Sequence, residues 1–90
     1  DKGYLWENFL ISERKKQIEY KQSLARGYFW RTKQQQEVDY VEENGGEISG
    51  FEFKWLKKKT HKLPKTFTET YNANSKVIDR DNFREFIIIK

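Results

Sequence analysis

The strongest constraint on the fold is a pair of alternating segments joined by a glycine-containing turn. Residues 37–42 and residues 47–55 each alternate side chains in the way that strands do. Between them, Glu43-Asn44-Gly45-Gly46 supplies residues that tolerate the positive φ angles of a tight hairpin. We therefore predict that the two segments form an antiparallel hairpin.

Alternation also predicts which side chains of this hairpin share a face. In its first strand, Val38 and Tyr40 are expected on one face and Asp39 on the other. In its second strand, Glu52 and Lys54 point the same way, about 7 Å apart along the chain. We expect the carboxylates of Asp39 and Glu52 to lie on one face of the sheet.

The other elements follow from the spacing of apolar residues and from turn residues. They are a helix over residues 4–21, a strand over 27–31, a helix from Pro64 to about residue 71, a strand over 75–79 and a final helix over 82–87. The fourth strand follows a helix, so we predict that it runs parallel to the third. The order α-β-β-β-α-β-α indicates an α+β domain with a small mixed sheet flanked by helices.

The predicted core uses the large apolar residues at the periodic positions of these elements. Its members are Phe9, Val38 or Tyr40, Phe51, Phe53, Phe67 and Val77. Gly50 lies inside the third strand, where a glycine often marks the close approach of another group.

Composition limits the class of protein and the kinds of site. Ninety residues, here 1–90, make one domain. The chain contains no Met, even at position 1, which predicts that it is a piece excised from a longer protein or a processed protein. The absence of Cys and the single His exclude a disulfide framework and a Cys- or His-based metal site. No run approaches eighteen apolar residues, so a cytoplasmic location without a membrane partner is expected.

An Asp on one strand and Glu-x-Lys on its neighbour suit a divalent metal ion and a phosphate. Mg²⁺ takes one or two carboxylates and keeps several waters, while a nearby Lys stabilises charge that builds on a phosphate. Asp39, Glu52 and Lys54 supply these groups, and Glu7 on the first helix adds a carboxylate. The alternatives are an ordinary ion pair between Asp39 and Lys54, and a helix-start role for Glu7 near the helix dipole.

Four strings in order carry a resemblance to known families. They are Leu5-Trp6-Glu7-Asn8-Phe9, Phe29-Trp30-Arg31, Glu37-Val38-Asp39-Tyr40 and Phe51-Glu52-Phe53-Lys54. Together they resemble the C-terminal domain of unknown function that follows the ATP-binding core in a group of prokaryotic AAA-type ATPases. The order Glu, Asp, Glu-x-Lys is also similar to the PD-(D/E)XK nuclease-like superfamily, although Val38 stands where the motif has Pro.

The resemblance implies a restriction-endonuclease-like αβββαβ core with Glu7, Asp39, Glu52 and Lys54 at the catalytic positions. It implies Mg²⁺ as the cofactor, held by Asp39, Glu52 and Glu7. Many members of that superfamily use the fold for binding or structure, which is the alternative that the resemblance implies. No Gly-Lys-Ser/Thr phosphate loop occurs in the sequence, so the expected partner is an ATPase core in the same full-length protein.

Nucleic acid is the second expected partner. The net charge of +4 is compatible with a polyanion, and the basic run Lys57-Lys58-Lys59 follows the Glu-x-Lys strand directly. We interpret this run and Arg31 as candidate phosphate contacts to DNA; a solvated loop and a salt bridge are the respective alternatives. The expected function is a nucleic-acid-associated accessory domain with a Mg²⁺-dependent nuclease site, and the alternative is a catalytically silent docking module.

Overall fold

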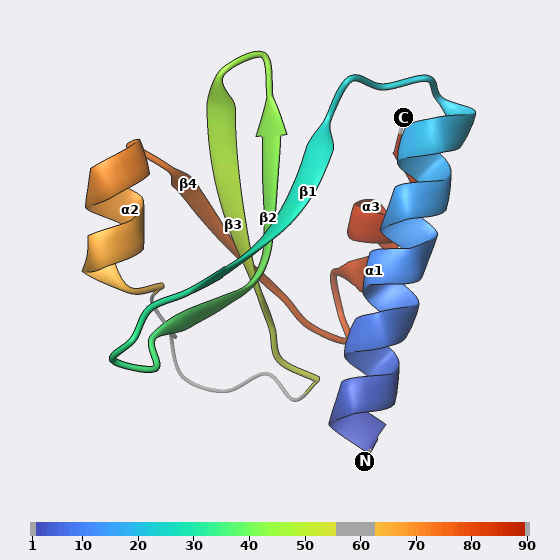
Figure 1. Ribbon diagram of the computed structural model, residues 1–90. Helices are drawn as coiled ribbons and strands as arrows, with labels where there is room; N and C mark the ends of the chain where they lie inside the picture. The colour runs from blue at the N-terminus through green and yellow to red at the C-terminus, as the bar shows by residue number, and fades with distance from the viewer. Residues whose placement is uncertain (1, 56–62, 90) are drawn as a thin grey trace.

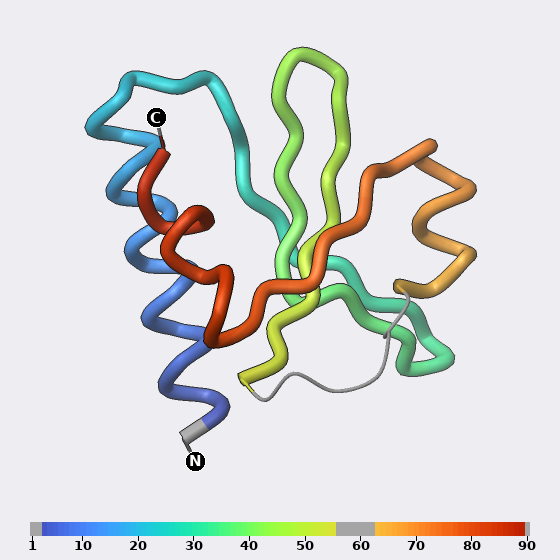
Figure 2. The backbone as a smooth tube through the Cα atoms, turned by 180° about the vertical axis from the view of Figure 1, so that it is seen from behind, coloured from blue at the N-terminus to red at the C-terminus, as the bar shows by residue number. Residues whose placement is uncertain are grey.

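A computed structural model describes residues 2–55 and 63–89 of the chain (Figure 1). The elements in order are α1 (Lys2–Tyr20), β1 (Arg26–Arg31), β2 (Glu37–Asn44), β3 (Glu47–Phe53), α2 (Lys65–Tyr71), β4 (Asn74–Ile78) and α3 (Phe83–Ile87). The sheet lies in the middle, with α1 and α3 on one side and α2 on the other (Figures 1 and 2). The predicted order of elements is confirmed. None of the helices in the described part of the chain is long and apolar enough to cross a membrane.

The sheet has four strands in the order β1-β2-β3-β4. β1, β2 and β3 are antiparallel neighbours, whereas β4 runs parallel to β3. The fold is therefore α+β with a small mixed sheet, and the predicted parallel pairing of the last strand is confirmed.

The turn between β2 and β3 has the geometry that its sequence predicts. Gly45 and Gly46 have φ angles of +61° and +85°, which suit a two-residue hairpin loop. The Gly46 N–H donates to a carboxylate oxygen of Glu43 at 2.9 Å. This turn fixes the register that pairs Tyr40 with Phe51 at the far end of the hairpin.

The core consists of two clusters, one on each side of the sheet. The first is buried beneath α1 and α3 and contains Leu10, Tyr40, Phe51, Phe53, Ile78 and Phe86. The second lies against α2 and contains Val38, Val41, Leu63 and Phe67. β3 is therefore covered on both sides, which explains why even Glu52 within it is buried.

Two core predictions were wrong by one residue. Phe9 is 45 % exposed, whereas the adjacent Leu10 is fully buried, because α1 turns a slightly different face to the sheet. Val77 is only half-buried, whereas the adjacent Ile78 is buried in the core, with 2 % of its surface exposed. The burial of Phe51, Phe53 and Phe67 is confirmed.

The prediction that Val38 and Tyr40 share a face was also wrong. The β1–β2 register shifts, so that Tyr28 pairs with Val41 while Trp30 pairs with Val38. Such a bulge places an extra residue in one strand and breaks the simple alternation of faces. Val38 therefore joins the cluster under α2, and Tyr40 joins the cluster under α1 and α3.

Gly50 allows α2 to pack closely against β3. A Cβ atom at Gly50 would lie 2.6 Å from the ring of Phe67 and 2.7 Å from Leu63. The sequence prediction of a close approach at this glycine is confirmed.

An ion pair ties α1 to the sheet. The Arg14 guanidinium donates to both carboxylate oxygens of Glu42, at 2.6 and 3.0 Å, and to the Phe86 carbonyl oxygen at 2.8 Å. Only 8 % of the Glu42 side chain is exposed. Burial, and then the Glu42 carboxylate, raise the pKa of the neighbouring Tyr40 hydroxyl.

Candidate carboxylate and lysine site

The site begins where the pairing of β2 and β3 ends. The register between the two strands runs from Asn44 and Glu47 at the turn to Tyr40 and Phe51, after which the strands separate (Figures 1 and 2). Just beyond this point, the Phe53 N–H donates to an Asp39 carboxylate oxygen at 2.8 Å. The Asp39 side chain thus accepts a hydrogen bond from the backbone of β3.

Asp39 and Glu52 lie on adjacent antiparallel strands, as predicted, but the prediction that they share a face of the sheet was wrong. Phe51 and Phe53 both pack beneath α1 and α3, so strand alternation turns Glu52 between them to the side of α2, whereas Asp39 lines a cleft against α1. Glu52 is 8 % exposed, and its carboxylate lies 3.4 Å from the Lys54 ammonium. Lys54 is the more accessible partner, with 39 % of its side chain exposed. The ion pair of Lys54 is therefore with Glu52, two residues before it in the chain.

The pKa of Glu7 on α1 is affected by the charges of all three of these groups. Its pKa is raised, first by burial and then by the negative charges of Asp39 and Glu52, while the Lys54 ammonium acts in the opposite direction. A like charge disfavours a second carboxylate, and an opposite charge favours it. The charges of Asp39, Glu52 and Lys54 thus all act on the Glu7 carboxyl group.

Glu7 and Asp39 line a cleft of about 600 Å³ between α1 and the strands β1 and β2. Tyr4 and Lys15 of α1 lie on one wall, while Phe29 of β1 contributes to the other. Glu52 and Lys54 are not among the residues of the described chain that line this cleft. Their charges nevertheless act on Glu7 from outside the cleft.

Within residues 2–55 and 63–89, no three Asp, Glu or His side chains lie close enough together to hold a metal ion. Mg²⁺ needs only one or two carboxylates, because water and substrate phosphate supply its other ligands. The hard oxygen donors of Asp39 and Glu52 fit that chemistry, and Glu7 is a neighbour that responds to their charge.

The candidate phosphate contacts divide into two groups. Arg31 forms an exposed ion pair with Glu37 at 3.0 Å, which is the salt bridge that we considered as its alternative role. An exposed pair of this kind contributes little free energy, so Arg31 is able to exchange its partner. Lys57, Lys58 and Lys59 lie outside the described residues.

Sequence reasoning missed the walls of the cleft. Tyr4, Lys15 and Phe29 belong to separate elements, and no local pattern indicates that α1 crosses over β1 at this place. The aromatic character of Tyr4 and Phe29 did not indicate a cleft either, because isolated exposed aromatic residues are common on small domains.

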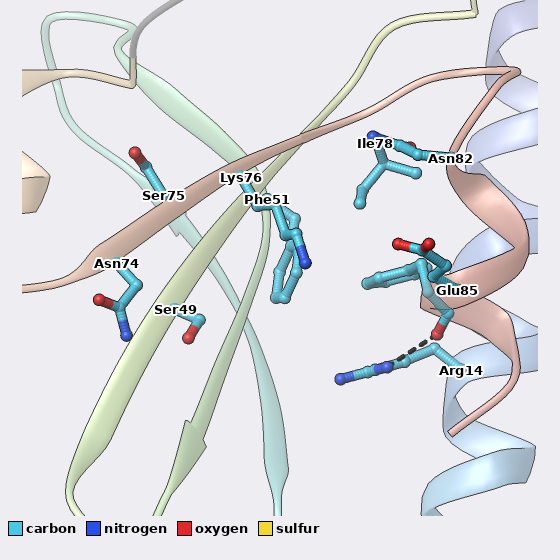
Figure 3. Close-up of a pocket in the computed structure, with 10 residues that line it drawn as sticks. Arg14, Ser49, Phe51, Asn74, Ser75, Lys76, Ile78, Asn82 and Glu85 are labelled. Carbon is cyan, nitrogen blue, oxygen red and sulfur yellow. Dashed lines mark hydrogen bonds between the residues drawn. The ribbon is translucent and has the colours of Figure 1, made fainter. Parts of the chain in front are cut away.

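A second cavity, of about 300 Å³, lies between β4 and α3 (Figure 3). Arg14 and Lys76 contribute cations to its lining and Glu85 an anion, while Phe51 contributes an aromatic ring. Arg14 is already committed to Glu42 and to the Phe86 carbonyl oxygen. This cavity is separate from the group around Glu7.

The fold and the coupled carboxylates define a small α+β domain with a cleft beside its mixed sheet. The chain belongs to the DUF4143 family, a domain of unknown function, and the match covers residues 2–88. No curated protein and no solved structure matches the chain.

Proposed function

We propose that this chain is a nucleic-acid-associated accessory domain of a prokaryotic AAA-type ATPase, with a Mg²⁺-dependent phosphodiester-cleaving site of the PD-(D/E)XK kind. The observation that carries the proposal is that Glu7 and Asp39 line one cleft, while Asp39 accepts a hydrogen bond from the backbone of β3 next to the Glu52–Lys54 ion pair. These four residues are the ones at which the chain resembles that superfamily. The order of helices and strands and the parallel pairing of β3 with β4 also support the proposal.

In this proposal Asp39 and Glu52 hold the metal ion. The bound ion would polarise the phosphoryl oxygen and lower the pKa of a water molecule. The bond from the Phe53 N–H orients the Asp39 carboxylate and leaves its second oxygen available. Glu52 holds the Lys54 ammonium at the same strand end, where its charge would stabilise a phosphate as negative charge builds on it.

The test is cleavage by the full-length ATPase that contains this domain. With Mg²⁺ or Mn²⁺ and ATP, we expect cleavage of DNA or RNA. Lys54→Ala should abolish cleavage while metal binding remains, because the role of Lys54 is at the transition state. Asp39→Asn or Glu52→Gln should weaken metal binding itself.

Lys65→Ala, at an exposed position on α2, is the matched control and should cleave like the unmodified protein. The proposal of catalysis fails if the unmodified full-length protein cuts neither polymer under these conditions. It also fails if cleavage occurs but Lys54→Ala and Lys65→Ala cleave equally well.

A second candidate function is docking without catalysis, favoured by apolar side chains on the surface of α1. Leu5 is 66 % exposed and Phe9 45 % exposed, one turn apart on this helix. Such residues are typical of a surface that a partner covers. If Leu5→Asp and Phe9→Asp release the domain from a separately expressed ATPase core, while metal ions leave the carboxylates unperturbed, the docking function is the correct one.

A further inference from the structure

We infer that the cleft between α1 and the strands β1 and β2 binds single-stranded nucleic acid by stacking bases on its aromatic walls. The inference rests on the proposed function, since this cleft contains Glu7 and Asp39, and it names the form of the polymer that the site takes.

The first supporting observation is a pair of exposed aromatic rings in one cleft. Tyr4 of α1 is 65 % exposed and Phe29 of β1 is 73 % exposed, and both line it. A ligand that covered both rings would remove their apolar surface from water, which is favourable. Bases have flat π faces that stack on aromatic side chains regardless of sequence.

The state of the polymer follows from the same geometry. In a double helix each base is stacked between its neighbours, so its faces are not available to a protein ring. Bases of a single strand are free to stack on Tyr4 and Phe29. A cleft of about 600 Å³ is in the range of ligand sites, which run to about 1,000 Å³.

The charges of the cleft predict how binding depends on metal ions. Three carboxylates line it, those of Glu7, Glu37 and Asp39, against the two cations of Lys15 and Arg31. Alone, this set has one excess negative charge and repels phosphates. One divalent cation held at Asp39, as in the proposed function, would turn this into one excess positive charge, and Lys15 and Arg31 would then be able to contact the strand.

The experiment measures fluorescence anisotropy of labelled oligothymidylate, oligouridylate and a DNA duplex of equal length, at low and fixed salt. The protein has the Lys54→Ala background so that the probe is not cut. In Mg²⁺ we expect the single strands to bind roughly tenfold tighter than the duplex, and EDTA should abolish this binding. Phe29→Ala and Tyr4→Ala should each weaken it roughly five- to a hundredfold, as the loss of one stacked base does.

Tyr20→Ala is the matched control, because Tyr20 is 80 % exposed on the same helix but does not line this cleft. The inference is overturned if the duplex binds as tightly as the single strands. It is equally overturned if EDTA has no effect, or if Phe29→Ala and Tyr4→Ala bind like Tyr20→Ala.

Failure of the inference and failure of the proposed function give different results. Cleavage of a duplex by the full-length protein, with no preference for single strands in the binding assay, overturns the inference and leaves the proposed function standing. Metal-dependent single-strand binding that needs Phe29 and Tyr4, without any cleavage, supports the inference and counts against catalysis.

Discussion

Arg14 is the residue on which the docking of α1 depends most. Its guanidinium neutralises the buried Glu42 carboxylate and binds the Phe86 carbonyl oxygen, so one side chain joins α1, β2 and α3. Arg14→Ala would leave a buried charge without its partner. We expect the free energy of unfolding, measured with denaturant, to fall by about 3 kcal/mol.

Lys16→Ala provides the control for Arg14→Ala. Lys16 pairs with Glu13 at 2.9 Å on the solvent side of the same helix, where 72 % of its side chain is exposed. Its loss should change the free energy of unfolding by no more than about 0.5 kcal/mol. Equal effects of the two substitutions would show that the Arg14 pair contributes no more than a surface contact.

Glu7 makes stability depend on pH in a definite direction. Because its pKa is raised in the folded state, folding favours its neutral form. Its contribution to stability is present below the pKa of the unfolded chain and is lost as the pH rises through the folded pKa. Glu7→Gln should therefore match the unmodified protein in acid and become the more stable of the two as the pH approaches neutrality.

The measurement for Glu7 is thermal unfolding of both proteins across a pH series. Glu19→Gln, at an exposed position of the same helix, is the matched control. A stability difference for Glu7→Gln that does not grow with pH would contradict the coupling of Glu7 to Asp39 and Glu52.

At the scale of elements, the packing of α2 on β3 depends on a missing side chain. Gly50→Ala would place a methyl group 2.6 Å from the Phe67 ring, so α2 or the strand has to shift. We expect a loss of about 1–3 kcal/mol in the free energy of unfolding. Thr66→Ala, at an exposed position of α2, should stay within about 0.5 kcal/mol; if Gly50→Ala does as well, α2 is not packed against β3 in this way.

The order of the elements was predictable because each has a strong local signal. Gly45 and Gly46 specify the hairpin, and its register places the strand ends that carry Asp39 and Glu52 side by side without any knowledge of the rest of the chain. The errors at Phe9 and Val77 are errors of phase, since a helix or strand with apolar residues in succession does not indicate which one faces the core.

Long-range features were not predictable from local pattern. The bulge between β1 and β2 depends on how two strands fit together, so the separation of Val38 from Tyr40 was missed. The proximity of Glu7 to Asp39 depends on where Leu10 and its neighbours seat α1 on the sheet. The family resemblance, and not the periodicity of the sequence, indicated that Glu7 belongs to the same site as Asp39, Glu52 and Lys54.

For the whole molecule, the two sides of the sheet have different roles. α2 covers one side with a small apolar cluster. α1 crosses the other side and brings Glu7 close to the place where β2 and β3 separate. The cleft beside this place is formed by elements from the first half of the chain. Stability and the proposed site therefore both depend on how α1 is seated.

The central claim is that Asp39 and its neighbours form one site that responds to a divalent metal ion. The Phe53 amide reports on it directly, since its N–H donates to the Asp39 carboxylate at 2.8 Å. In a Mg²⁺ titration followed by amide and side-chain carboxyl NMR, we predict saturable shifts at Phe53, Asp39 and Glu52 and a fall in the pKa of Glu7. Asp39→Asn should remove these shifts, and Lys54→Ala should retain them. If Mg²⁺ leaves the Phe53 amide and the Asp39 and Glu52 carboxyl groups unshifted, the four residues form only a network of ion pairs and hydrogen bonds, and the metal site does not exist.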